Sequence, residues 1–221
     1  MPTNDFFDEQ LDHSKAKHDI LQQYLSAWFP IMTFYAKKSG SKVLRYVDGF
    51  AGQGEYESGQ YGSPVIALKV VNQNNSLKNC GLTFEFLFFE ETPERFSRLE
   101  QVIASISYPP CIIPKLECGK FETKLNTWLD LQKTSTAGMA PTFVFVDPFG
   151  PAGFSMELMN RILQFRSTKV LVTIPSKSTG LFHLSVFAFT VFAHLMLVHT
   201  PTTKISIGAR LISSTTYCCR K

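Results

Sequence analysis

The sequence has few charged residues and none of the cysteine spacings that mark a zinc site. Charged residues are 18% of the 221 residues, the net charge is +4, and no run of Lys or Arg stands out. This charge permits an anionic partner such as nucleic acid but does not argue for one. None of the five cysteines forms a Cys-x-x-Cys pair or lies near a His at zinc-finger spacing: Cys80, Cys111, Cys118, Cys218 and Cys219. We therefore expect no metal site, and reduced thiols in an intracellular, cytoplasmic protein.

The N-terminus lacks the apolar run of a secretory signal, because its first residues are polar and acidic. We predict a disordered tail over residues 1–13. Hydrophobic residues make up 44% of the chain and Phe occurs 20 times, which is typical of a globular domain with a sizeable core. We place one α/β domain at residues 14–174 and an atypical apolar segment at residues 175–221.

Two common nucleotide-binding motifs are absent from the glycine-rich turn that follows the first predicted strand. The run VLRYV (43–47) predicts this strand, which ends in the turn Asp48-Gly-Phe-Ala-Gly-Gln-Gly54. The glycine order does not fit the Gly-x-Gly-x-x-Gly fingerprint of dinucleotide sites, and Gly54 is followed by Glu55 where a P-loop needs lysine. Such a turn at the carboxyl end of a parallel strand can still cradle a nucleotide-like cofactor, because glycine lets a ligand approach the backbone.

The pattern Asp48-x-Phe50-x-Gly52-x-Gly54 resembles the first motif of S-adenosylmethionine-dependent methyltransferases, especially those that methylate amino groups of bases. The resemblance implies that Asp48 and the backbone of Gly52 and Gly54 hold the methionine portion of S-adenosylmethionine. It places Phe50 in the same cofactor-binding motif. The alternative is a turn that only links a strand to a helix.

An acidic pair ends the second predicted strand, TFEFLFF (83–89). In nucleotide-binding α/β folds an acid at this position accepts hydrogen bonds from ribose hydroxyls, and we assign this role to Glu90. Glu91 is better suited to the N-terminus of the helix that Pro93 opens. The alternative is that both acids serve only that helix.

A third acidic residue follows the apolar run TFVFV (142–146), which predicts a central parallel strand buried on both faces. Asp147-Pro148-Phe149 resembles the Asp/Asn-Pro-Pro-aromatic motif of base-amino methyltransferases, with the second proline missing and the aromatic residue one place early. The resemblance implies that Asp147 accepts hydrogens from the target amino group while Phe149 packs beside the base. The alternative is a proline-rich turn. Since Asp48, Glu90 and Asp147 all end apolar strands, we expect the three carboxylates to meet at one sheet edge.

The remaining elements follow from local patterns. Apolar residues at helical spacing from Ile20 to Tyr35 predict a helix that Ser14 caps. We expect a kink or a division at Pro30, and an end at Lys37, Lys38 and Gly40. Lys17 and His18 reach a ligand if this helix lies over the sheet edge. Ser63 is the expected cap of a helix over residues 64–72.

Further strands are predicted at residues 111–116 and 169–174. The loop at residues 55–62 is either a lid over the cofactor or a solvent loop.

The chain changes character after residue 175. No charged residue occurs from 178 to 203, and residues 181–198 are almost wholly apolar. Three interpretations compete: a helix or strand pair that completes the sheet, a membrane segment, and a terminus that does not complete the domain. The lack of helical stripe, alternation and turn signals favours the last two.

Taken together, residues 15–173 resemble the three-Cys-motif partner proteins. The resemblance rests on matches in five stretches: ILQQYLSAW (20–28), YVDGFAG (46–52), GSP (62–64), FFE (88–90) and FVDPFG (145–150). It implies a class I methyltransferase-like fold and a separate three-Cys-motif protein as a partner. The cysteines of that motif belong to the partner.

We therefore expect a Rossmann-like, doubly wound parallel sheet with an N-terminal helical layer and C-terminal strands that are incomplete. The leading functional hypothesis is an S-adenosylmethionine-dependent methyltransferase acting on a base amino group or another nucleophile. A non-catalytic scaffold with this fold is the main alternative. A third hypothesis, a nucleic-acid-binding module, requires a basic face around Arg45, Lys120 and Lys169.

Overall fold

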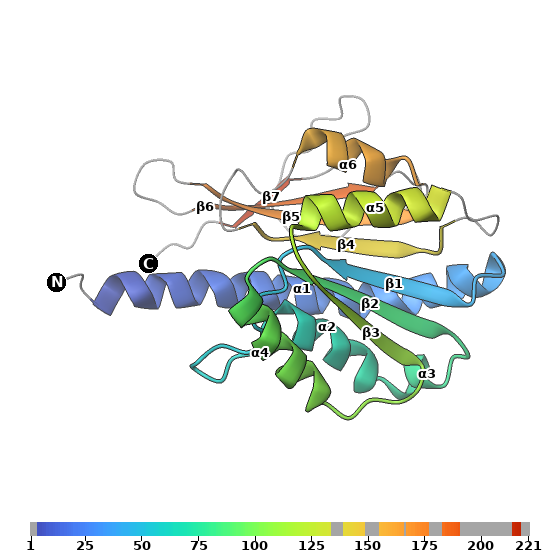
Figure 1. Ribbon diagram of the computed structural model, residues 1–221, viewed down its shortest axis with the longest axis horizontal. Coiled ribbons are helices and arrows are strands. Elements are labelled where there is room, and N and C mark those ends of the chain that lie inside the picture. The colour runs from blue at the N-terminus through green and yellow to red at the C-terminus, as the bar shows by residue number, and fades with distance from the viewer. Residues whose placement is uncertain are drawn as a thin grey trace.

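The computed structural model describes residues 4–133, 139–148, 155–165, 167–176, 183–190 and 214–217, with side chains described between residues 15 and 172. Within these ranges the strands form one sheet in the order β3-β2-β1-β4-β5-β6-β7 (Figure 1). The strands are β1 (Val43–Asp48), β2 (Thr83–Glu90), β3 (Ile112–Cys118), β4 (Thr142–Val146), β5 (Thr168–Ser176), β6 (His183–Thr190) and β7 (Ser214–Tyr217).

The first five strands are parallel, as the sequence predicts for runs this apolar. β4 is buried at every position because helices cover both of its faces. β3 is an edge strand, so Pro114 inside it removes no hydrogen bond from the sheet interior. The strand order reverses direction between β1 and β4, and this topological switch point is where open α/β sheets bind ligands.

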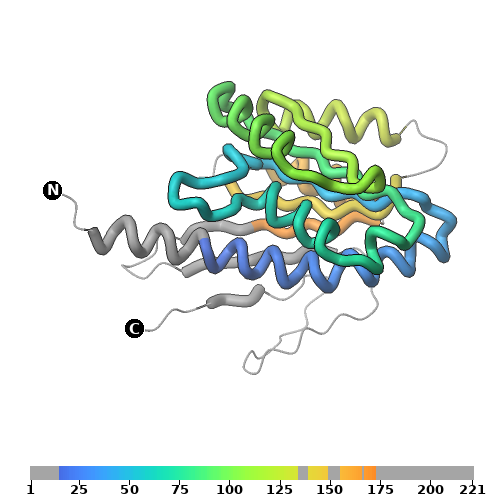
Figure 2. Tube along the Cα trace, turned by 90° about the horizontal axis from the view of Figure 1, so that it is seen from below, coloured from blue at the N-terminus to red at the C-terminus, as the bar shows by residue number. Residues whose placement is uncertain are grey.

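Helices lie on both faces of the sheet (Figures 1 and 2). They are α1 (Asn4–Lys38), α2 (Ser63–Asn72), α3 (Asn75–Lys78), α4 (Pro93–Ala104), α5 (Phe121–Lys133) and α6 (Met156–Leu163). Apolar residues of α1 to α4 pack in one core against one face, and those of α5 and α6 pack in a second core against the other. The doubly wound, Rossmann-like fold with an N-terminal helical layer is therefore confirmed.

The N-terminal helix differs from its prediction at two points. It begins at Asn4, not after a cap at Ser14, so a helix runs through most of the predicted tail. It also continues as one helix through Pro30. Pro30 is exposed, so the carbonyl that loses its amide partner faces water. Gly40, at φ 78°, follows the helix end as expected.

The described strands β6 and β7 extend the sheet beyond β5, which agrees with the strand-pair interpretation that the sequence disfavoured. β6 pairs antiparallel with β5, and β7 pairs antiparallel with β6. β5 itself continues through Pro175 to Ser176. The apolar residues of β6 fall on both parities, so the alternation that marks a strand was absent from the sequence. Within the described ranges, no helix has both the length and the apolar character needed to cross a membrane.

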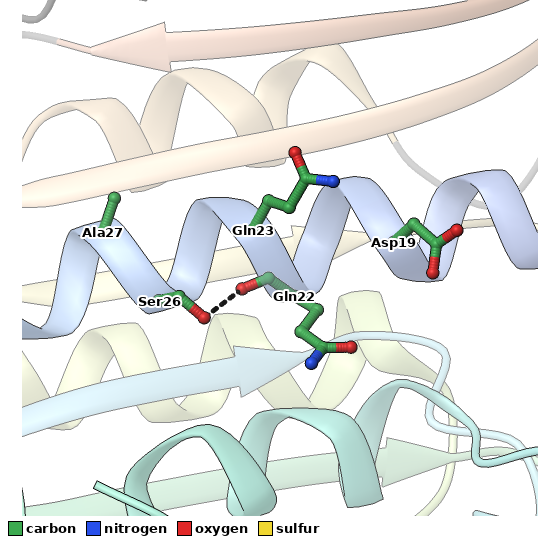
Figure 3. Close-up of a pocket in the computed structure, with 5 residues that line it drawn as sticks. All are labelled: Asp19, Gln22, Gln23, Ser26 and Ala27. Carbon is green, nitrogen blue, oxygen red and sulfur yellow. Dashed lines mark hydrogen bonds between the residues drawn. The ribbon is translucent and has the colours of Figure 1, made fainter.

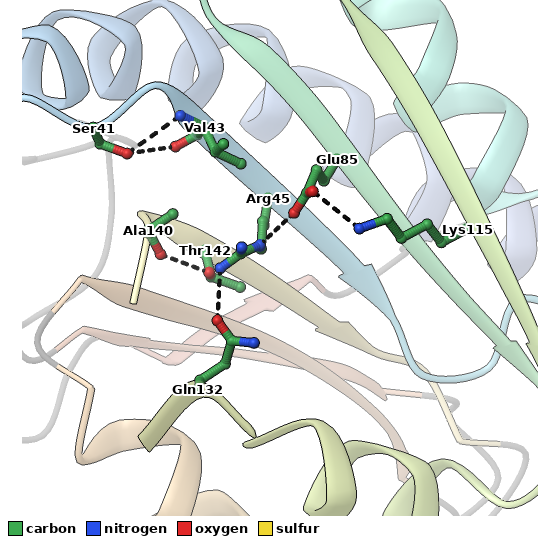
Figure 4. Close-up of polar contacts among 8 residues, drawn as sticks. All are labelled: Ser41, Val43, Arg45, Glu85, Lys115, Gln132, Ala140 and Thr142. Atoms are coloured by element: carbon green, nitrogen blue, oxygen red, sulfur yellow. Dashed lines mark hydrogen bonds and ion pairs between the residues drawn. The ribbon is translucent and has the colours of Figure 1, made fainter. Parts of the chain in front are cut away.

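A polar network crosses the α5 side of the sheet (Figure 4). Glu85 on β2 accepts from Arg45 at 2.6 Å and from Lys115 at 3.0 Å. Arg45 also donates to Gln132 of α5 at 3.0 Å and lies over the ring of Trp128. Arg45 and its neighbours are therefore paired with one another across β1, β2, β3 and α5.

The basic face required by the nucleic-acid hypothesis does not form. Arg45 lies on the face of β1 that packs against α5, together with Val47. Lys169 shares the parity of Leu171, which packs on the α1 side of the sheet. Lys120 lies within 3.9 Å of Glu91. Strand parity thus places Arg45 and Lys169 on opposite faces of the sheet.

The aromatic core under α1 sets the position of that helix and generates a test. Phe29 is fully buried, with ring centroids 5.6 Å from Phe84 and 6.0 Å from Phe86. We expect Phe29→Ala to lower the free energy of unfolding by about 3–5 kcal/mol, because a large cavity opens against two strands. Phe34 of the same helix is exposed, so Phe34→Ala should change stability by less than about 0.5 kcal/mol. Urea unfolding checks both, and equal effects would contradict this placement of α1.

Candidate functional site

The glycine turn after β1 is joined to the ends of both neighbouring strands. The Gly49 amide donates to the carbonyl of Phe145 on β4 at 3.0 Å, and the Ala51 amide donates to the carbonyl of Phe89 on β2 at 3.0 Å. A Cβ at Gly49 would come within 2.8 Å of the Phe121 ring, so this position has no room for a side chain. The turn is therefore held in place by the sheet itself.

Glu90 at the end of β2 fixes the next part of the turn. Its Oε2 accepts from the Gly52 amide at 2.9 Å, and its Oε1 accepts from the Thr92 amide at 2.9 Å. The residue is 5% exposed. Both oxygens thus accept backbone amides, one in the turn and one at the start of α4. A ribose hydroxyl would have to share these oxygens, and the ribose role remains a prediction.

Asp48 is fully buried at the end of β1. One oxygen accepts from the Phe50 amide at 3.2 Å and the other from the Tyr46 hydroxyl at 3.2 Å, and the Ser63 hydroxyl also donates to the carboxylate. These three donors are neutral. Burial raises the pKa of Asp48 to about 7, although the three hydrogen bonds oppose that shift.

Ser63 was predicted to cap α2 but has another role. Gly62 is the cap residue, Ser63 begins the helix, and no side-chain hydrogen bond caps it. The Ser63 hydroxyl bonds to Asp48 instead. The Ser63 hydroxyl is therefore used as a donor to a buried carboxyl group, and the proximity of these two residues cannot be read from local sequence.

The two remaining turn glycines adopt left-handed backbone conformations. Gly52 has φ 62° and Gly54 has φ 81°, which only glycine and, less readily, Asn accept at low cost. A Cβ at Gly52 would meet no heavy atom within 4 Å, whereas one at Gly54 would come within 3.0 Å of Leu99. Open space therefore lies beside Gly52, and Gly54 packs on α4.

Phe50 contributes to packing as well as to the turn. Its ring lies 5.5 Å from that of Phe121 on α5, and its amide bonds to Asp48. Four of the five predicted cofactor-binding residues thus lie in or beside one turn, and Glu90 contacts that turn from the end of β2. The Phe50 side chain packs against the second core.

Asp147 at the end of β4 forms an ion pair with Lys17 of α1 at 2.7 Å. The two side chains are 21% and 16% exposed. The negative charge of Asp147 adds to the effect of burial in raising the pKa of Asp48. In the register of the sheet, Asp48 pairs with Phe88 on β2 and with Phe145 on β4. Glu90 and Asp147 therefore each lie two residues further toward the carboxyl ends of their strands than Asp48 does.

The three predicted carboxylates therefore meet at the carboxyl edge of β2, β1 and β4, as expected. Phe149, assigned with Asp147 to the substrate side, lies outside the described residues.

The side chains of His18 and Tyr56 also lie beside this edge, and the sequence indicated only weakly that they belong to the site. His18 is next to Lys17 on α1, and its ring centroid lies 5.9 Å from that of Tyr56. Burial lowers the pKa of His18, although the charge of Asp147 opposes the shift. Tyr56 comes from the loop at residues 55–62. Helical periodicity placed Lys17 and His18 on α1, but only the packing of α1 across the sheet brings them to the site.

The loop at residues 55–62 is a short hairpin. The Tyr56 amide donates to Gln60, the Gly59 amide donates to Tyr56, and Glu55 forms a bridge with Tyr61. The ammonium of Lys69 on α2 lies 3.4 Å from the centroid of the Tyr61 ring. The hairpin therefore has internal hydrogen bonds and an anchor on α2, and Tyr56 directs it toward His18.

A separate hollow lies along α1 (Figure 3). Its lining comes from one side of the helix: Asp19, Gln22, Gln23, Ser26 and Ala27. The Ser26 hydroxyl donates to the Gln22 carbonyl at 2.7 Å, which is a bond within the helix. The hollow contains none of the predicted site residues, so the chemistry points to the strand edge instead.

The strand edge fits the cofactor that the turn motif implies. A buried carboxylate whose bonded donors are all neutral favours a positively charged ligand nearby, and S-adenosylmethionine carries both an ammonium and a sulfonium. The space beside Gly52 lets a ligand approach the backbone. Among the described residues no group of three or more His, Cys, Asp or Glu side chains could hold a metal ion.

Comparisons with known proteins give distant structural likenesses. No family model matches the chain, and no curated protein matches it. Protein LPL1258 from Legionella pneumophila is 13% identical, with a TM-score of 0.44 over 72% of this chain and 68% of that chain. The methyltransferase PaMTH1 of Podospora anserina, bound to S-adenosylhomocysteine, is 13% identical, with a TM-score of 0.34 over 78% and 71%.

The 16S rRNA methylase ArmA is 16% identical to this chain, with a TM-score of 0.32 over 81% of this chain and 80% of that chain. Likenesses of this size carry no argument about activity, and they do not show membership of the three-Cys-motif partner family. The Rossmann-like assignment rests on the strand order and on the two helical layers.

The burial of Asp48 predicts a pH dependence of stability. Because the folded pKa of about 7 lies above the ordinary 3.8, the native state keeps its proton longer than the unfolded chain does. Stability should therefore fall as pH rises between these values, by up to about 4 kcal/mol from this group. Asp48→Asn should remove that part of the decline, and Glu100→Gln at an exposed position should not. Melting temperatures from pH 4 to pH 8 check this, and parallel curves for wild type and Asp48→Asn would contradict it.

Proposed function

We propose that this chain is an S-adenosylmethionine-dependent methyltransferase. The observation that carries the proposal is the meeting of Asp48, Glu90 and Asp147 around a glycine turn at the topological switch point of a doubly wound sheet. The turn motif supplies the cofactor class, and the switch point supplies the place.

The roles follow from burial and contacts. Asp48 orients the turn through the Phe50 amide and places negative charge beneath the cationic methionine portion of the cofactor. Glu90 holds the Gly52 amide and offers its remaining lone pairs to the ribose. The bound cofactor supplies a methyl group already activated on a sulfonium. The protein's contribution is then mainly the alignment of the acceptor.

Asp147 is the proposed hydrogen-bond acceptor for the nucleophile. It is partly exposed, unlike Asp48, so an acceptor molecule can reach it. An amino group of a base, or another nucleophile with a hydrogen to donate, fits a carboxylate in this position. Membership of the three-Cys-motif partner family, and a protein partner with it, are part of the same proposal. Two features favoured the scaffold alternative: closing strands that are missing and an altered motif at Asp147-Pro148-Phe149. The first no longer supports it, because β6 and β7 extend the sheet. The altered motif still does.

The space beside Gly52 allows a direct test of cofactor binding. Asn accepts a positive φ more readily than other side chains do, so Gly52→Asn should fold while filling that space. We expect S-adenosylhomocysteine to raise the melting temperature of wild type. Gly52→Asn should weaken its binding at least about tenfold.

Gly40→Asn is the matched control, since Gly40 also has a positive φ and open space around a Cβ but precedes the opposite end of β1. Calorimetric titration gives the affinities. The proposal fails if wild type binds neither S-adenosylmethionine nor S-adenosylhomocysteine. The placement of the site fails if Gly52→Asn binds as wild type does.

A further inference from the structure

We propose that Lys17 of α1 binds the α-carboxylate of the cofactor's methionine portion, and that it leaves Asp147 to do so. The inference rests on the proposed function and names a cofactor-binding residue outside the glycine turn. It is carried by the hydrogen bonds of the turn and by the Lys17–Asp147 ion pair.

The amide donors of the turn are already bonded within the protein. Four consecutive amides, those of Gly49, Phe50, Ala51 and Gly52, already donate to protein acceptors: two strand carbonyls, Asp48 and Glu90. A ligand carboxylate cannot use these amides without breaking bonds that hold the turn. The Gly52 amide already donates to Glu90 at 2.9 Å, so a ligand would have to share or displace that bond, and the role of the Gly52 backbone stays a prediction.

A carboxylate on the ligand needs a cation beside it at this edge of the sheet. Three carboxylates gather at this edge, so a fourth carboxylate from a ligand would meet repulsion unless a cation lay beside it. Lys17 is a cation in contact with the cluster, 2.7 Å from Asp147. Its side chain is 16% exposed, so a ligand can reach it while bulk water screens it only partly.

The amino-acid group of the cofactor is a zwitterion, and this edge offers both charges that it needs. An amino-acid group has its ammonium and carboxylate on one carbon, so its two partners must also be close together. Asp48 and Asp147 supply negative charge and Lys17 supplies positive charge at the same edge. The flexible four-carbon stem of a lysine lets its ammonium change partners with little backbone movement.

The exchange has a consequence for the substrate side. Without cofactor, Lys17 occupies an oxygen of Asp147. Once Lys17 turns to the carboxylate, the donor group of the methyl acceptor can take the place of the Lys17 ammonium at that oxygen. Through Lys17, the ability of Asp147 to accept a hydrogen bond from the methyl acceptor would depend on bound cofactor.

A comparison of two ligands isolates the contact between Lys17 and the α-carboxylate from the other contacts of the cofactor. S-adenosylhomocysteine carries the amino-acid group, whereas 5′-methylthioadenosine has the same adenosine and thioether without it. We expect Lys17→Met, which keeps the length of the stem, to weaken S-adenosylhomocysteine at least about tenfold and to leave 5′-methylthioadenosine unchanged. Lys17→Arg should restore most of the affinity. Asp147→Asn should bind S-adenosylhomocysteine as tightly as wild type or more tightly.

Lys15→Met is the control, because Lys15 is exposed on the same helix. Titration calorimetry of each variant, with its melting temperature, gives the comparison. Equal losses for both ligands, or no loss for either, would overturn the role of Lys17 while leaving cofactor binding intact. If wild type binds neither ligand, the proposed function fails first and the role of Lys17 fails with it.

Discussion

The hydrogen bonds that join the glycine turn to β2 and β4 are the constraint on which the candidate site depends. The turn is short and its backbone has positive φ at Gly52 and Gly54, so fixed partners are needed to hold its shape. Carbonyls of the two flanking strands and the carboxylates of Asp48 and Glu90 supply them. Because those partners come from three different strands, the turn has this shape only when the parallel sheet is complete around it.

The same bonds explain why acidic residues are stable in a buried position. Asp48 is removed from water, and its raised pKa records the cost. Amide and hydroxyl donors offset part of that cost. Asp147 is placed differently, since it keeps partial exposure and a lysine partner. Two carboxylates on neighbouring strands thus have distinct environments, one suited to hold a turn and one suited to meet a substrate.

Much of the fold could be predicted because its signals are local. Apolar runs predicted β1, β2, β4 and β5, and Pro93 predicted the start of α4. The course of α1 through Pro30 and the pairing of β6 and β7 could not be predicted. In sequence, an exposed proline inside a helix cannot be told from a proline that ends the helix. A strand with apolar residues on both parities cannot be told from a segment without regular structure.

The sequence by itself determined which residues are candidates for the site: an acid at the end of each of three apolar strands, and glycines where the backbone must turn. The convergence of those acids followed from the rule that parallel strands end at one edge. Only the tertiary structure decided what each acid contacts. The Ser63 hydroxyl turns from its helix to Asp48, Glu90 holds the Gly52 amide, and Lys17 reaches Asp147 across 130 positions of the sequence. These contacts depend on how α1 and α2 pack on the sheet, and no local pattern of residues specifies that packing.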